Sequence, residues 1–140
     1  MCINIDIASL ESAQEYYIPV PPVPASRPKV ARFGTYYSKR HQQYVKDFAT
    51  CLHHYPPEWE YLDKEARLIV GLEFVCTRPK RVTNAAPHYD IDNLSKLPLD
   101  CMTSADIFWH DDRQIELLIA HKRYAKVNEE PHTLVRVYAI

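Results

Sequence analysis

The chain has 140 residues, of which 46% are hydrophobic and 25% are charged, with a net charge of −1 at pH 7. This size fits one domain with its own core, and the composition excludes fibrous and low-complexity proteins. Residues 1–6 contain no basic region followed by a long apolar run. We therefore expect neither a signal peptide nor a transmembrane span, and no membrane partner.

The first half of the chain predicts an edge strand, a basic loop and a helix. Residues 16–24 are rich in proline, which removes hydrogen-bond donors, so they form an edge strand at best. Residues 25–37 read as a loop. Ser38 can cap a helix that continues to about His54. Residues at helical spacing predict the buried face of this helix: His41, Tyr44, Val45, Phe48, Cys51, Leu52 and Tyr55. An acidic connection follows at residues 58–65.

The middle of the chain predicts a strand and a second helix. Residues 67–77 alternate most clearly, with five apolar side chains on one face: Leu68, Val70, Leu72, Phe74 and Cys76. Residues 78–87 form a basic loop. Asp92 or Asn93 can cap a helix that runs to about Met102, with Pro98 inside it.

A short strand is predicted at residues 107–109, and two longer strands, at 114–124 and 133–140, complete the fold. We expect Trp109 in the core, and Ile115, Leu117 and Ile119 on one face of the strand at 114–124. The element order is roughly β-α-β-α-β-β. It predicts an α/β (α+β) single domain over residues 1–140, with a mixed β-sheet packed by two helices.

The four cysteines, Cys2, Cys51, Cys76 and Cys101, are too far apart for a CxxC zinc pattern and lie in apolar contexts. They are expected to be reduced core thiols of a cytoplasmic protein.

Basic residues gather in two segments that we interpret as a DNA-binding surface. They are Arg27, Lys29, Arg32, Lys39 and Arg40 in the first segment, and Arg78, Lys80 and Arg81 in the second. Phe33, Tyr36 and Tyr37 lie among the first group, and such mixtures can grip phosphates and stack on exposed bases. Two alternatives remain open: the basic side chains form solvated faces, and the tyrosines cover the core.

Residues 90–116 contain seven acidic residues and only two basic ones, Lys96 and Arg113. The acidic residues form either a wet acidic surface or a site for a hard metal ion. Asp90 and Asp92 point to one side if the backbone is extended, and carboxylate oxygens suit Mg²⁺ or Mn²⁺. Asp111 and Asp112 are adjacent and point to opposite faces, so only one is expected to join them. Lys96 follows Asp92 by one helical turn and can reach a phosphate or a leaving oxygen.

This acidic stretch resembles the RusA-type Holliday-junction resolvases, a family of small endonucleases of phages and bacteria. The resemblance rests on Asp90-Ile91-Asp92-Asn93-Leu94-x-Lys96, Leu99-Asp100, Asp111-Asp112-x-Gln114-Ile115 and Lys122. A Pro-x-Pro-x-x-Arg-Pro-Lys motif at residues 22–29, followed by an aromatic-rich segment and a helix, also fits. The similarity covers roughly residues 16–140.

The resemblance implies a homodimer that binds four-way DNA junctions and hydrolyses phosphodiesters with Mg²⁺, or alternatively Mn²⁺. By motif position, Asp90, Asp92 and Asp112 would be metal ligands and Lys96 the catalytic lysine. It also implies recombination or repair in a bacterial cytoplasm, from a phage or prophage gene. Leu97, Pro98 and the segment 102–106 depart from the family pattern.

A second hypothesis is a DNA-binding protein that keeps the fold and does not cut. The intact carboxylates and lysine favour the enzyme. His88 and His110 flank the acids and are interpreted as bystanders.

Overall fold

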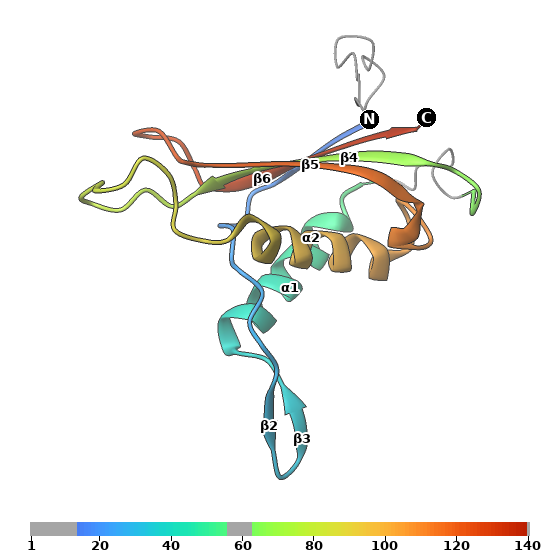
Figure 1. Cartoon of the computed structure of the whole chain (residues 1–140), viewed down its shortest axis with the longest axis horizontal. Helices are drawn as coiled ribbons and strands as arrows, with labels where there is room; N and C mark the ends of the chain where they lie inside the picture. The colour runs from blue at the N-terminus through green and yellow to red at the C-terminus, as the bar shows by residue number, and fades with distance from the viewer. Residues whose placement is uncertain (1–13, 56–62, 140) are drawn as a thin grey trace, which may run out of the picture.

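The computed structural model describes residues 14–55 and 63–139 (Figure 1). A four-stranded mixed sheet, in the order β1-β6-β4-β5, carries both helices on one face, and a two-stranded hairpin projects away from them (Figure 1). The elements are β1 (Gln14–Ile18), β2 (Lys29–Ala31), β3 (Gly34–Tyr36), α1 (Lys39–Leu52), β4 (Leu68–Cys76), α2 (Ile91–Ala105), η3 (Asp112–Gln114), β5 (Ile115–Tyr124) and β6 (His132–Ala139).

The predicted fold class, a mixed sheet packed by two helices, is confirmed. Strand β4 lies inside the sheet, parallel to β5 and antiparallel to β6. Strand β1 lies at an edge, as predicted, but it ends at Ile18, directly before the proline-rich residues 19–24. Helix α2 provides the crossover between the parallel strands β4 and β5, which a tight turn cannot join. Among the described helices, none is long and apolar enough to cross a membrane.

The core lies between the sheet and the helices. The predicted face of β4 is confirmed, since all five of its apolar side chains belong to the buried cluster. Helix α1 begins after Ser38, whose hydroxyl accepts a hydrogen bond from the His41 amide, as the sequence predicts. Its face is buried as expected except at Val45, which is 37% exposed.

The side chains of β5 do not alternate as predicted. Leu68 pairs with Ile115, but Ile69 pairs with Leu117, so the register shifts by one residue at Glu116. Because side chains alternate with a period of two, this bulge places Ile115 against the core and turns Leu117 and Ile119 to the open face of the sheet. The prediction that these three apolar residues share a face is therefore wrong.

Two other segments differ from expectation. Residues 25–37, predicted as a loop, contain the hairpin of β2 and β3. The segment 107–109 is irregular and forms no strand, because Phe108 and Trp109 both turn into the core instead of alternating. The core position of Trp109 is confirmed, and its indole nitrogen donates to the Thr103 hydroxyl at 2.7 Å.

The described cysteines are free thiols, as predicted. Burial raises the pKa of Cys76 to about 11 and that of Cys101 to about 12, so both stay protonated and unreactive near neutral pH. Cys2, and with it the N-terminal segment tested for a signal peptide, lies outside the described residues, as does most of the acidic connection at 58–65.

The packing between α1 and the sheet predicts the cost of a cavity. Phe48→Ala should lower the free energy of unfolding by about 3–5 kcal/mol, because Phe48 is fully buried. Val45→Ala, on the exposed side of the same helix, should change it by less than about 0.5 kcal/mol. Urea unfolding followed by circular dichroism measures both, and equal losses would contradict the assigned helix face.

Candidate active site

Two carboxylates stand free at the amino end of helix α2. Asp90 is the N-cap residue, with an extended backbone (φ −66°, ψ 132°), and its side chain makes no capping hydrogen bond. The helix thus begins earlier than predicted, and Asp92, an expected cap, lies in its first turn. Both are exposed, and neither carboxylate has a hydrogen-bond or ion-pair partner among the described residues. The positive end of the helix dipole favours negative charge at this place.

Three long-range contacts fix this end of α2. The Ala25 amide donates to the Asn93 carbonyl at 2.9 Å, and Lys122 Nζ donates to the Tyr89 carbonyl at 2.6 Å. Arg40 donates to the Tyr89 hydroxyl at 3.3 Å and lies 5.8 Å from the centre of its ring. The hairpin segment, helix α1 and strand β5 therefore all converge on residues 89–93.

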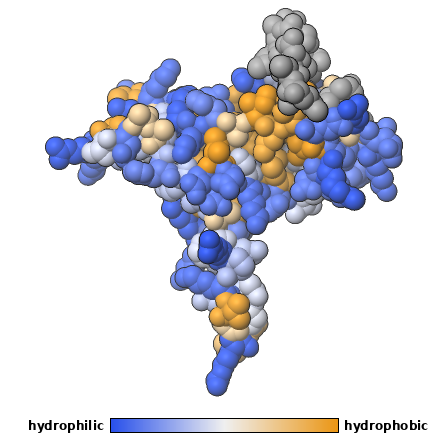
Figure 2. Space-filling view, viewed as in Figure 1, coloured by the Kyte–Doolittle hydropathy of each residue, from blue (hydrophilic) through white to orange (hydrophobic). Residues whose placement is uncertain are grey.

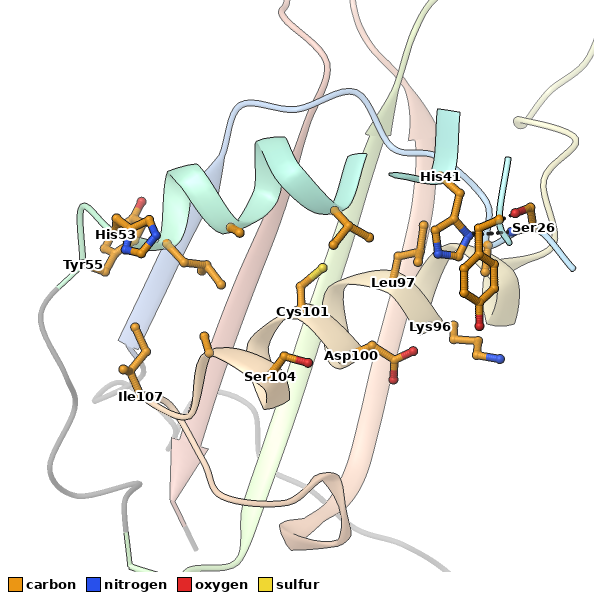
Figure 3. A pocket seen from close by; sticks show the side chains of 16 residues that line it. Ser26, His41, His53, Tyr55, Lys96, Leu97, Asp100, Cys101, Ser104 and Ile107 are labelled. Carbon is orange, nitrogen blue, oxygen red and sulfur yellow. Dashed lines mark hydrogen bonds between the residues drawn. The ribbon is translucent and has the colours of Figure 1, made fainter. Parts of the chain in front are cut away.

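Lys96 lies one turn after Asp92 on the exposed side of α2. It lines one end of a cavity of about 510 Å³ between the helices, together with Asp100, Ser26 and His41 (Figure 3). The rest of this cavity is mostly apolar and belongs to the groove between α1 and α2. The exposed lysine therefore lies near three polar side chains, on the same side of the molecule as the root of the hairpin.

His41 joins the hairpin root to helix α1. Its Nδ1 accepts a hydrogen bond from the Ser26 amide at 3.1 Å, and Tyr37 stacks on its ring with centroids 4.1 Å apart. Burial lowers the pKa of His41, and the charge of Lys96 lowers it further, whereas Asp100 opposes the shift. A neutral imidazole at pH 7 keeps the acceptor that this bond needs.

The adjacent acids Asp111 and Asp112 have different surroundings. Asp111 caps η3, where it accepts hydrogen bonds from the Arg113 amide at 2.9 Å and from Arg113 Nε at 3.0 Å. The amide and the guanidinium of Arg113 lower the pKa of Asp111, while the hydrogen bond that protonated Asp112 donates to the Asp111 carboxylate raises the pKa of Asp112. Asp111 is thus engaged within the protein, and Asp112 is the exposed member of the pair.

The structure separates Asp112 from the other two predicted ligands. Asp112 precedes the start of β5, whereas Lys122, near the end of that strand, contacts Tyr89. Ile115 and Lys122 are seven residues apart, about 23 Å along a strand. Figure 1 shows η3 and the amino end of α2 at opposite ends of the helix. Within the described residues, no group of three His, Cys, Asp or Glu side chains is close enough to hold a metal ion.

The predicted DNA-binding residues lie on three segments: the hairpin, the start of α1 and the loop before α2. All eight are exposed: Arg27, Lys29 and Arg32 on the hairpin segment, Lys39 and Arg40 at the start of α1, and Arg78, Lys80 and Arg81 on the loop that leads into α2. His88 contacts Asn84 at 2.6 Å, and His110 pairs with Asp106 at 3.0 Å, at the other end of the helix.

Sequence reasoning missed the part that Tyr89 and Lys122 play at this site. The sequence marks Lys122 only as the last residue of the motif, and its spacing does not predict a contact with Tyr89, 33 positions earlier. The alternation of β5 was the available signal, but the bulge at Glu116 reverses it.

Two exposed carboxylates and an exposed lysine thus lie on the first turns of α2, and exposed basic residues lie on the hairpin, on α1 and on the loop before α2. A family model described as Endodeoxyribonuclease RusA matches residues 19–138. The chain therefore belongs to the RusA endodeoxyribonuclease family, as its sequence motifs indicate. No curated protein sequence matches the chain.

The contrast between the paired acids predicts unequal effects on stability. Asp111→Ala removes the cap of η3 and the partner of Arg113, and should lower the free energy of unfolding by about 1 kcal/mol. Asp112→Ala should lower it much less, because that carboxylate repels its neighbour. Chemical denaturation at pH 7 compares the two, and a larger loss from Asp112→Ala would reverse the assignment.

Proposed function

We propose that this protein is a Mg²⁺-dependent endonuclease that cuts four-way DNA junctions. The observation that carries the proposal is the pair of unpartnered carboxylates, Asp90 and Asp92, with Lys96 one turn further along the same helix. Membership of the RusA family supports nuclease activity. The non-cutting alternative would leave these exposed charges without a role.

The donor set at the amino end of α2 fits Mg²⁺. This ion binds proteins through one or two carboxylates and keeps waters and substrate phosphates as its other ligands. Asp90 and Asp92 offer oxygen ligands that no described residue occupies, and Mn²⁺ would accept the same set. A bound ion would lower the pKa of a coordinated water and neutralise charge on the scissile phosphate.

Lys96 supplies the remaining positive charge. Its ammonium would donate to the leaving oxygen or to a non-bridging oxygen, where negative charge grows in the transition state. The exposed bases on the hairpin segment, on α1 and on the 78–89 loop would hold the DNA backbone against this end of α2. Lys122 and Arg40 have a structural role instead: both donate hydrogen bonds to Tyr89 and so fix the residue next to Asp90.

We infer that the protein acts as a homodimer whose ligand sets are shared between subunits. Asp112 lies at the far end of α2 from Asp90 and Asp92, so one chain does not gather the three predicted ligands. A two-fold axis can bring Asp112 of one copy to Asp90 and Asp92 of the other, and it does so twice. Two such sites would make the paired cuts that resolve a junction in recombination and repair, in the cytoplasm of a bacterial host.

The carboxylates should be needed for cutting more than for binding. Asp90→Asn and Asp92→Asn should each abolish cleavage of a labelled four-way junction in Mg²⁺, because a neutral amide is a poor ligand for this ion. Junction affinity should be kept or increased, because a charge that repels phosphates is lost. Either variant cutting at the wild-type rate would exclude that residue as a ligand.

Replacing Lys96 distinguishes an enzyme from a protein that only binds DNA. Lys96→Met should lower the single-turnover cleavage rate by about a hundredfold or more, the scale for loss of one electrostatic donor. Junction affinity should change much less, because several other bases hold the backbone. Lys46→Met, an exposed lysine on α1, is the matched control and should cut normally. A rate within a few-fold of wild type for Lys96→Met would leave the lysine structural.

Mixing two inactive variants tests the shared site. Asp90→Asn and Asp112→Asn proteins are unfolded together and refolded as an equal mixture. If ligands are shared across the two-fold axis, each mixed dimer has one intact site. About a quarter of all sites are then intact, and their activity appears as single nicks. If all ligands come from one chain, every site stays defective and the mixture stays inactive.

A further inference from the structure

The hairpin of β2 and β3 carries an apolar side chain where nothing in the described chain covers it. Each strand has three exposed residues, and Ala31 pairs with Gly34 across a two-residue turn. Gly34 has φ +116°, which a residue with a side chain rarely adopts, so the turn is built to be tight. Phe33, at its tip, is 99% exposed, and Val30 is 87% exposed.

This arm stands clear of the molecule. Figure 1 shows it projecting from the helical side, and Figure 2 shows apolar atoms on it, apart from the other hydrophobic surface. Single exposed hydrophobic residues are common on protein surfaces. A phenylalanine at the tip of a projecting arm differs, because it gains neither packing nor shielding there. Its position fits a role in contact with another molecule.

The root of the arm lies beside the proposed active site. The Ala25 amide bonds to Asn93 in the first turn of α2, and Ser26, Tyr37 and Lys96 line the same cavity. Tyr37 and Phe33 are four residues apart, which is about 13 Å of extended chain. DNA held at the amino end of α2 is therefore within reach of the tip.

The surroundings of Phe33 favour a nucleic acid over a protein. Arg32 is next to it, and Lys29 and Arg27 follow along the same segment, all exposed and with no acid between them. These cations match phosphates, and an aromatic ring between them can stack on a base, an arrangement typical of binding to unpaired nucleotides. A continuous duplex has no free base faces, because each base is stacked on both sides. A branch point has them where the helices part.

We propose that the arm enters the branch point of the DNA junction and that Phe33 stacks on a base exposed there. This inference rests on the proposed function and adds the feature that recognises the branch. Apolar side chains inserted between bases are a known way to hold DNA in an opened form. The arm then provides selectivity for branched over continuous DNA, while the basic residues on α1 and on the loop before α2 provide affinity for both.

The test compares binding to a four-way junction and to a duplex of the same sequence, in EDTA so that no cutting occurs. Phe33→Ala should weaken junction binding by about 5- to 150-fold, the equivalent of the 1–3 kcal/mol of one base–aromatic stack. Duplex binding should stay within about twofold. Phe33→Trp keeps an aromatic face and should restore selectivity. Val30→Ala removes an apolar side chain from the same arm without touching the ring, and should behave as wild type.

A fluorescent base analogue at the branch point gives the second readout. Its emission should change on binding of wild type and of Phe33→Trp, and should not change with Phe33→Ala. A selectivity for junctions that survives Phe33→Ala would overturn the inference and leave the nuclease intact. So would sedimentation showing that Phe33→Ala breaks the dimer, because the ring would then contact protein. A wild-type protein with no preference for junctions would overturn the proposed function as well.

Discussion

The convergence of three distant segments on residues 89–93 is the constraint on which the site depends. A hydrogen bond from Lys122, one from Arg40 and one to Asn93 tie the start of α2 to the sheet, to α1 and to the root of the hairpin. Two of these bonds end on backbone carbonyls, so they fix the chain and leave the side chains of Asp90 and Asp92 free. Rigid backbone with unengaged carboxylates is what a site for a hard cation needs.

The bulge in β5 makes the Lys122 contact possible. Ile115 and Lys122 are separated by an odd number of residues, so in a regular strand they would point to opposite faces. The extra residue at Glu116 places both on the helix side, where Ile115 joins the core and Lys122 pairs with Phe74 and reaches Tyr89. One irregularity at the start of the strand therefore serves both packing and the site at its end.

Much of this fold could be predicted because its signals are local. The alternation of β4, the cap at Ser38 and the spacing along α1 depend only on neighbouring residues, and all three are confirmed. The hairpin could not be predicted, because both its strands are exposed and have no apolar face. The bulge and the segment 107–109 depend on tertiary packing that propensity does not describe.

The candidate site shows the same division. The carboxylates of Asp90 and Asp92 are free, and that of Asp111 is bonded to Arg113, but their roles as ligands stay predictions. The position of Asp112 could not be read from a motif, because 19 residues of helix and turn lie between it and Asp92. Sequence motifs bring together residues that a family uses jointly, and do not say whether one chain or two supply them.

Junction cleavage by the purified protein tests the central claim most directly. An end-labelled four-way junction and a matched duplex are incubated with the protein in Mg²⁺ and in EDTA. The proposed function predicts paired nicks in the junction with Mg²⁺, an intact duplex, and junction binding without cutting in EDTA. Equal cutting in EDTA, or a junction that is bound but left whole in Mg²⁺, would contradict a metal-dependent junction endonuclease.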